Sequence, residues 1–317
     1  MAQTVVTGGA GFIGSHVVRA LLDRGERVVV IDNFDDYYDP AIKRRNVAPF
    51  LGHPNARLIE ADIRDAAAMS AAFAGIGPHR LVHLAGRGGV RPSLALPYLY
   101  FDLNLLGTVQ VLEVSRAAGC AHAVVASSSS VYGTRTDGKP FREDEPLEAA
   151  LSPYGASKQA MERYAESFQG ITGIPVTALR FFSVYGPGQR PDMAIHQFVR
   201  RIEAGETITA FGDGSSTRDH TYIADIVQGV LAALDRPHGY RVYNLGEFRT
   251  VSLRDLLQAI ETATGKRASV VWEPMRPEDM PATYADITRA KTELGYDPRF
   301  SLERGLGEFV RWYRGQS

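Results

Sequence analysis

The chain has 317 residues, of which 44% are hydrophobic and 22% are charged, and its formal net charge at pH 7 is −1. This length suits two domains, or one large domain with an appended lobe. The near-zero charge gives no sign of a nucleic-acid-binding or membrane-binding surface, and no apolar run approaches the length of a membrane span. Because Cys120 is the only cysteine, no intramolecular disulfide can form, and we expect a small buried side chain there.

The first half of the sequence alternates apolar runs with helical patterns. A strand begins close to the N-terminus and leaves no room for a signal peptide, so we expect a cytoplasmic protein. Strands are predicted at 4–7, 27–31, 57–60, 81–84, 123–127 and 176–182, and helices at 13–24, 66–74, 103–118 and 154–170. Strands that are apolar on both faces and separated by helices predict a Rossmann-type, doubly wound parallel sheet of the α/β class.

The second half begins with a loop at 184–191 that is rich in glycine and proline. Beyond it, helices are predicted at 192–204, 253–264 and 302–312, and short strands that could pair with each other at 208–211 and 270–272. A further strand at 242–245 returns to the sheet. We therefore predict a Rossmann domain at 1–182, rejoined by 220–247. A smaller C-terminal substrate-binding lobe makes up most of 183–317 and closes over the sheet.

Three glycines, Gly8, Gly11 and Gly14, follow the first strand and open the first helix. Such a turn lets backbone N–H groups approach a pyrophosphate at the positive end of the helix. An ordinary turn that needs a positive φ can have the same pattern, so the glycines alone are a weak signal. Asp32 strengthens it, because an acidic residue about twenty residues further on accepts hydrogen bonds from an adenosine ribose and repels a 2′-phosphate. The sequence thus favours NAD over NADP.

The sequence contains two groups of candidate catalytic residues, one on a predicted helix and one at the end of a predicted strand. Tyr154 and Lys158 are four residues apart on a predicted helix that starts at Pro153, so their side chains share a face. An ammonium beside a phenol favours the phenolate, which is a general base for a hydroxyl, although a surface pair at this spacing is also common. Ser127–Ser130 ends a buried strand, where serine hydroxyls donate either to a ligand or to the local backbone.

Together these features resemble the extended short-chain dehydrogenase/reductase family, in its nucleotide-sugar epimerase and dehydratase branch. The resemblance covers nearly the whole chain and is carried by Thr7–Gly14, Asp32-Asn33, Asp62-Ile63, His83-Leu84-Ala85, Asn104, Ser128–Gly133, Tyr154 with Lys158, Arg180-Phe181-Phe182, Tyr185-Gly186-Pro187, Arg218-Asp219 and Tyr284-Ala285-Asp286. It implies that Tyr154 is the catalytic base, that Lys158 holds the nicotinamide ribose and that Ser128 assists the tyrosine. The NAD-binding residues that it implies are Gly8, Gly11, Phe12, Ile13, Gly14, Asp32, Asn33, Lys43, Asp62, Ile63, Leu84, Ala85, Gly86, Asn104, Tyr154 and Lys158.

The resemblance also implies a reaction. Dehydratases of this family carry an Asp-Glu pair after the active-site Thr, and decarboxylating members carry a nearby Glu, whereas this chain has Ser129 and Ser130. Elimination then lacks its acid and base, which leaves epimerisation by reversible hydride transfer. Segments 35–40, 89–93, 127–133 and 186–194 resemble UDP-glucuronate 4-epimerases. Arg190 would grip the sugar carboxylate in a planar two-point contact, or it would lie solvated in its loop.

The implied UDP-sugar site combines the serine turn with several arginines. Ser129, Ser130, Ser183 and Arg190 would bind the carboxylate. The complete set is Arg87, Ser128, Ser129, Ser130, Tyr154, Ser183, Arg190, Arg218, Arg276 and Asp279, with Arg218 and Arg276 on the diphosphate and Asp279 on the uridine ribose. We expect no metal. A 4-epimerase of UDP-glucose or UDP-N-acetylglucosamine and a non-catalytic NAD-binding regulatory protein are the alternatives. Members of the family are usually homodimers, here through helices 103–118 and 154–170.

Overall fold

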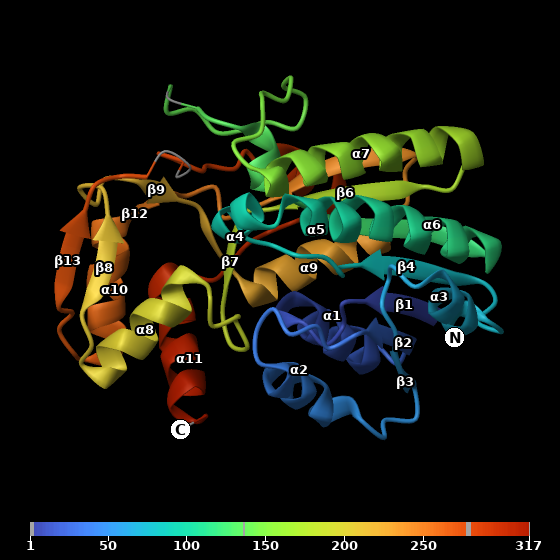
Figure 1. Ribbon diagram of the computed structural model, residues 1–317, viewed down its shortest axis with the longest axis horizontal. Coiled ribbons are helices and arrows are strands. Elements are labelled where there is room, and N and C mark those ends of the chain that lie inside the picture. The colour runs from blue at the N-terminus through green and yellow to red at the C-terminus, as the bar shows by residue number, and fades with distance from the viewer. Residues whose placement is uncertain (1–2, 136, 277–279, 317) are drawn as a thin grey trace.

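The computed structural model describes residues 3–135, 137–276 and 280–316, and Figure 1 shows a large sheet-containing domain beside a smaller lobe. The main sheet has seven strands in the order β11-β6-β5-β4-β1-β2-β3. Every neighbouring pair in it is parallel. The strands are β1 (Gln3–Thr7), β2 (Arg27–Asp32), β3 (Ala56–Glu60), β4 (His79–His83), β5 (Cys120–Ser128), β6 (Val176–Phe181) and β11 (Tyr240–Leu245). The expected Rossmann-type sheet and the returning strand near 242–245 are confirmed.

Helices cover both faces of this sheet, as Figure 1 shows. One face carries α3 (Ala66–Phe73), α6 (Gly107–Ala117) and α7 (Pro153–Thr172), and the other carries α1 (Phe12–Asp23), α2 (Pro40–Val47) and α9 (Ile223–Leu234). The buried residues of β1 divide between two hydrophobic cores, because Val5 packs under α3, α6 and α7 while Val6 packs under α1 and α9. This alternation is what a parallel strand buried on both faces requires. Cys120 is buried at the start of β5, as expected.

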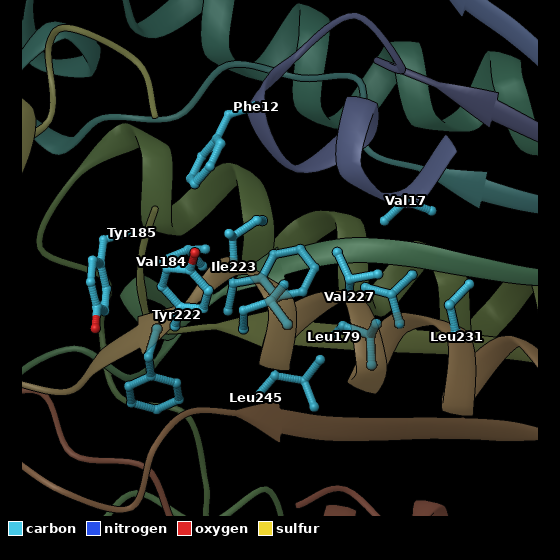
Figure 2. Close-up of a cluster of buried hydrophobic side chains, with 14 of the residues drawn as sticks. Phe12, Val17, Leu179, Val184, Tyr185, Tyr222, Ile223, Val227, Leu231 and Leu245 are labelled. Atoms are coloured by element: carbon cyan, nitrogen blue, oxygen red, sulfur yellow. The ribbon is translucent and has the colours of Figure 1, made fainter. Parts of the chain in front are cut away.

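The helix α9 was not anticipated from the sequence. Ten of its twelve residues are buried, so the helix has almost no face in contact with solvent. Figure 2 shows the reason: Ile223, Val227 and Leu231 lie between the strands and the α1 side chains Phe12 and Val17. The helix therefore joins the Rossmann core completely, and it brings the segment after β10 back to the main sheet.

The smaller lobe is built from the segments that follow β6. It contains α8 (Ala194–Ala204), β8 (Ile208–Phe211), α10 (Leu253–Thr264), β13 (Val270–Glu273) and α11 (Leu302–Arg314). The expected pairing of 208–211 with 270–272 is confirmed, and it is parallel. Two further strand pairs connect the lobes: β7 (Ser183–Tyr185) with β10 (His220–Tyr222), and β9 (Thr217–Arg218) with β12 (Val251–Ser252). Among the described residues, no helix has both the length and the apolar character needed to cross a membrane.

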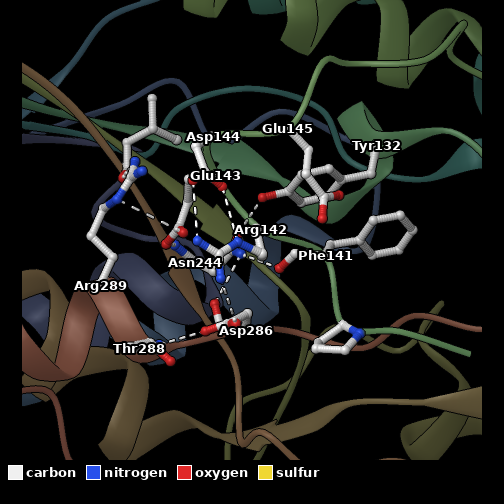
Figure 3. Close-up of polar contacts among 12 residues, drawn as sticks. Tyr132, Phe141, Arg142, Glu143, Asp144, Glu145, Asn244, Asp286, Thr288 and Arg289 are labelled. Carbon is white, nitrogen blue, oxygen red and sulfur yellow. Dashed lines mark hydrogen bonds and ion pairs between the residues drawn. The ribbon is translucent and has the colours of Figure 1, made fainter.

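A polar junction joins the segment after β5 to β11 and to the segment around Asp286 (Figure 3). The Tyr132 hydroxyl donates to Asn244 Oδ1 at 2.6 Å, and Asn244 Nδ2 donates to the carbonyls of Phe141 and Asp286. The buried Glu143 carboxylate accepts from the Asn244 backbone N–H at 2.8 Å, and its burial raises the pKa of this carboxyl group. Asn244 of β11 thus anchors the turn that carries the serines of the candidate site.

Candidate active site

A cavity of about 560 Å³ lies where the carboxyl ends of the parallel strands meet. Ligands of open parallel sheets bind at this edge. The cavity is lined by residues that follow β1, β2, β4, β5 and β6, by one face of α7, and by the loop between β7 and α8. Residues far apart in sequence therefore share one site, which extends from the Rossmann domain to the smaller lobe.

The glycine turn forms one wall of this cavity. Gly8 has φ +71°, and a Cβ there would lie 2.6 Å from the Ala85 backbone nitrogen. A Cβ on Gly14 would overlap the Gly8 carbonyl. The first turn of α1 holds no acidic residue and receives no side-chain cap, so its N–H groups remain available to an anion. A close backbone approach combined with an uncapped helix start fits the pyrophosphate of a dinucleotide.

The end of β2 supplies the acidic residue of the expected dinucleotide site. Asp32 is 7% exposed, and its carboxylate accepts the backbone N–H groups of Ala10 at 3.0 Å and Phe34 at 2.9 Å. Burial raises the pKa of this carboxyl group, and the charge of Lys43 opposes the rise. Lys43 lines the cavity and donates to the Asp35 carbonyl at 2.9 Å. The negative charge beside the glycine turn fits NAD and opposes a 2′-phosphate.

Tyr154, Lys158 and Ser128 meet in the cavity. The helix α7 starts with Pro153 after Ser152, whose side chain accepts the Gly155 N–H, so Tyr154 lies in the first turn. Burial raises the pKa of the Tyr154 phenol, while a hydrogen bond with Ser128 and the charge of Arg190 oppose the rise. The sequence suggested Lys158 as the group that favours the phenolate; Ser128 and Arg190 have this effect in the structure.

The Lys158 ammonium points to the end of β5. It donates to the Ala126 carbonyl at 2.8 Å, and burial lowers its pKa to about 8. One turn further along α7, Glu162 accepts from the Ser127 hydroxyl at 2.5 Å and from two nitrogens of Arg180, at 2.9 and 2.7 Å. Two side chains of α7 therefore hold Ala126 and Ser127, the two strand residues that precede Ser128. This arrangement fixes the position of the Ser128 hydroxyl.

The serine turn, Ser128–Ser130, and the loop between β7 and α8 that carries Arg190 line the same cavity. Ser129 and Ser130 lie in a 3₁₀ turn and line the cavity. The Ser128 hydroxyl oxygen caps this turn by accepting the Ser130 N–H at 3.1 Å. Ser183 and Arg190 line the same cavity from the segments after β6 and β7. The serine turn carries no carboxylate, so its side chains offer hydroxyl groups to a ligand, and Arg190 adds a guanidinium.

Several residues that sequence reasoning did not select also line the cavity, notably Tyr37 and Asp192. Arg190 donates to both oxygens of Asp192, with Nε–Oδ1 and Nη2–Oδ2 distances of 3.0 Å. The Tyr37 ring packs against the guanidinium groups of Arg87 and Arg190, at 4.4 and 5.3 Å from the ring centroid. Arg87 Nε is buried and has no hydrogen-bond partner. The signal for Tyr37 and Asp192 in the sequence is that they lie in 35–40 and 186–194, two of the segments that carry the family resemblance.

Not every expected site residue lines this cavity. The Asp62 carboxylate lies outside it and is bound by Arg64 and Asn33, at 2.7 and 2.9 Å. Asn104 is fully buried and exchanges hydrogen bonds with the Arg87 backbone, so it shapes the loop from below. Arg276 packs on the Phe211 ring in a separate hollow of the smaller lobe. Asp279 lies outside the described residues. The remaining expected cofactor and substrate residues, including Arg218, all line the cavity.

The pattern of the NAD dependent epimerase/dehydratase family matches residues 4–246 of this chain. The chain belongs to this family. The matched range contains the whole seven-stranded sheet except Gln3, together with the glycine turn, the serine turn and the Tyr154–Lys158 pair. The protein is therefore an enzyme of the NAD-dependent nucleotide-sugar epimerase family, and its cofactor is NAD.

Individual proteins similar to this chain include nucleotide-sugar 4-epimerases of two kinds. The chain is 37% identical over 313 residues to a UDP-glucuronate 4-epimerase of Thermodesulfobacterium geofontis, covering 98% of this chain and 96% of the relative. A crystal structure of a Bacillus cereus UDP-glucuronic acid 4-epimerase with UDP-glucuronic acid and NAD matches with a TM-score of 0.93 at 34% identity, over 99% and 100% of the two chains. A Thermotoga maritima UDP-glucose 4-epimerase with UDP-glucose matches with a TM-score of 0.91 at 33% identity, over 99% of each chain.

Proposed function

We propose that this enzyme interconverts UDP-glucuronic acid and UDP-galacturonic acid by inverting C4 of the sugar. The observation that carries the proposal is that Ser129, Ser130, Ser183 and Arg190 line one cavity, with no carboxylate in the serine turn. Hydroxyl donors and a guanidinium suit a sugar acid, whereas a dehydratase needs an acid and a base beside Ser128. The similarity to two UDP-glucuronate 4-epimerases supports the same substrate.

In the proposed reaction Tyr154 takes the proton of the C4 hydroxyl, directly or through Ser128. The hydrogen bond with Ser128 and the charge of Arg190 favour the phenolate that this step requires. Bound NAD supplies the acceptor and the donor of the C4 hydride. Tyr154 returns the proton to the C4 oxygen after the sugar has turned its other face, while the UDP group stays bound. The reaction therefore consumes no reductant and no oxidant.

The 4-keto form of the substrate is a hazard, because its C5 carboxylate is β to a ketone and can leave as CO₂. That loss requires the C–CO₂ bond to align with the carbonyl π system. Fixed donors from Ser129, Ser130, Ser183 and Arg190 would hold the carboxylate out of this alignment and keep its charge solvated. Retention of the carboxylate is thus a chemical reason for the four-residue set, in addition to affinity.

The remaining assignments are proposals of the same kind. Arg218 and Arg276 bind the UDP diphosphate, and Asp279 binds the uridine ribose. We also propose a homodimer formed through α6 and α7, because Tyr98, Leu106 and Ile171 are 91%, 58% and 81% exposed on or beside these helices. Gel filtration with light scattering measures the assembly, and a monomer contradicts this part of the proposal.

The test is to incubate the purified protein, without added cofactor, with UDP-glucuronic acid and separately with UDP-glucose. Formation of UDP-galacturonic acid, resolved by chromatography, supports the proposal. Arg190→Ala then raises KM for the acid and releases UDP-4-keto-pentose. Turnover of UDP-glucose alone favours the second candidate, a neutral-sugar 4-epimerase. One observation is in favour of that candidate: Arg190 already binds a carboxylate of its own chain, that of Asp192.

A further inference from the structure

The ion pair between Arg190 and Asp192 occupies the substrate cavity itself. Both guanidinium–carboxylate distances are 3.0 Å, which is the two-point geometry that a sugar carboxylate would need. The two side chains are 23% and 35% exposed. Asp192 is the more exposed partner, so an incoming carboxylate can displace it toward solvent.

Asp192 has a second hydrogen-bond donor. The Tyr37 hydroxyl lies 3.2 Å from Asp192 Oδ2, and it also lies 2.9 Å from the Gly88 carbonyl. The Tyr37 hydroxyl has one proton for these two acceptors, so it is contact with solvent that keeps a displaced Asp192 from becoming a buried unpaired charge. This avoids the large penalty that usually opposes the separation of an ion pair.

We propose that Asp192 is a specificity-determining residue, which occupies the Arg190 guanidinium until the carboxylate of the sugar acid displaces it. The inference rests on the proposed function, because it needs a substrate with a carboxylate. Asp192 is then a competing anion in the site. The affinity for the acid depends on how much more strongly Arg190 binds the substrate carboxylate than it binds Asp192. A neutral sugar does not compete for Arg190 and leaves the pair intact.

The experiment compares Asp192→Asn with wild type on UDP-glucuronic acid, and measures UDP-glucose as a substrate or as a competitive inhibitor. Asparagine keeps the shape but removes the competing charge. We expect KM for UDP-glucuronic acid to fall three- to tenfold, while the KM or Ki of UDP-glucose changes less than twofold. Asp192→Ala, which removes the side-chain hydrogen bond as well, should change KM in the same direction.

The chain supplies a matched control. Asp144 forms the same two-point pair with Arg142, two residues before it, at 3.1 Å for both contacts, and neither residue lines the cavity. Asp144→Asn should leave both substrates unaffected. In the double variant Arg190→Ala/Asp192→Asn, KM should equal that of Arg190→Ala alone, because Asp192 acts through Arg190.

The outcomes separate the two proposals. If wild type epimerises UDP-glucuronic acid but Asp192→Asn leaves its KM unchanged or raises it, the proposed function stands and the role of Asp192 is wrong. If wild type is inactive on UDP-glucuronic acid, both are wrong. A KM that falls equally for both nucleotide sugars also overturns the competition, because only the acid is a competitor.

Discussion

The ion pair beneath the catalytic helix gives the sharpest prediction for stability. The side chains of Glu162 and Arg180 are each 4% exposed, and two hydrogen bonds of 2.9 and 2.7 Å join them. Arg180 Nη1 is buried without a hydrogen-bond partner, so Glu162 supplies the guanidinium's compensating charge. Glu162→Gln keeps the shape but leaves that charge uncompensated. Breaking a buried pair in this way costs about 3–5 kcal/mol, a large part of a typical unfolding free energy of about 5–15 kcal/mol.

Urea unfolding of wild type and Glu162→Gln, followed by circular dichroism, measures this loss. Glu166→Gln is the control on the same helix, because Glu166 pairs with Arg163 at 51% and 75% exposure and should cost less than about 1 kcal/mol. The double variant Glu162→Leu/Arg180→Met should recover much of the stability, since no charge remains buried. A loss below about 1 kcal/mol for Glu162→Gln would refute the argument that Arg180 depends on this partner.

Three further predictions concern catalysis, pH and the glycine turn. Tyr154→Phe removes the proposed base, so the yield of UDP-galacturonic acid per unit time should fall about 10²–10⁴-fold, and retained activity would exclude the tyrosine. Burial raises the pKa of Glu247 to about 8 from an ordinary 4.5, so the native state keeps a proton that the unfolded chain loses. Wild-type stability then falls as pH rises between these values, and Glu247→Gln should gain in Tm over wild type from pH 5 to pH 8; a constant difference contradicts this. Gly14→Ala should lower Tm and the content of bound NAD, because its Cβ would overlap the Gly8 carbonyl. Gly170→Ala is the control: a Cβ there meets no atom within 4 Å, so this change should stabilise α7 by about 0.5–1 kcal/mol.

The sheet and its ligand-binding edge were predictable from the sequence. Most strands of the first half contain an apolar run such as Val28–Ile31, and parallel strands end at one edge. A residue at the end of a strand or directly after it is therefore placed at this edge, as for Gly8, Asp32 and Ser128. The pair Tyr154 and Lys158 was also accessible, because helical spacing fixes which side chains share a face.

Other elements were not accessible, for identifiable physical reasons. The helix α9 is apolar and buried on nearly all sides, and a run of this kind is not reliably separated from buried strand by its pattern. The predicted helix at 103–118 begins in the structure with a π-helical turn, Asp102–Leu106, before α6. The shorter helices α4 (Val90–Ala95) and α5 (Pro97–Phe101) offer too few residues for a periodic pattern. In these segments tertiary packing, and not local sequence preference, decides the conformation.

Long charged side chains set the other limit on prediction from sequence. The position of a serine hydroxyl follows closely from the backbone at the end of a strand. The guanidinium of a long arginine side chain can instead reach any of several nearby carboxylates. Arg190 and Arg142 both bind an aspartate two residues later, although only Arg190 lines the cavity. Under the proposed function, Asp192 and a sugar carboxylate are chemically equivalent ligands of Arg190. The choice between an acidic and a neutral sugar would then depend on the balance between Asp192 and the substrate, which a residue pattern alone does not contain.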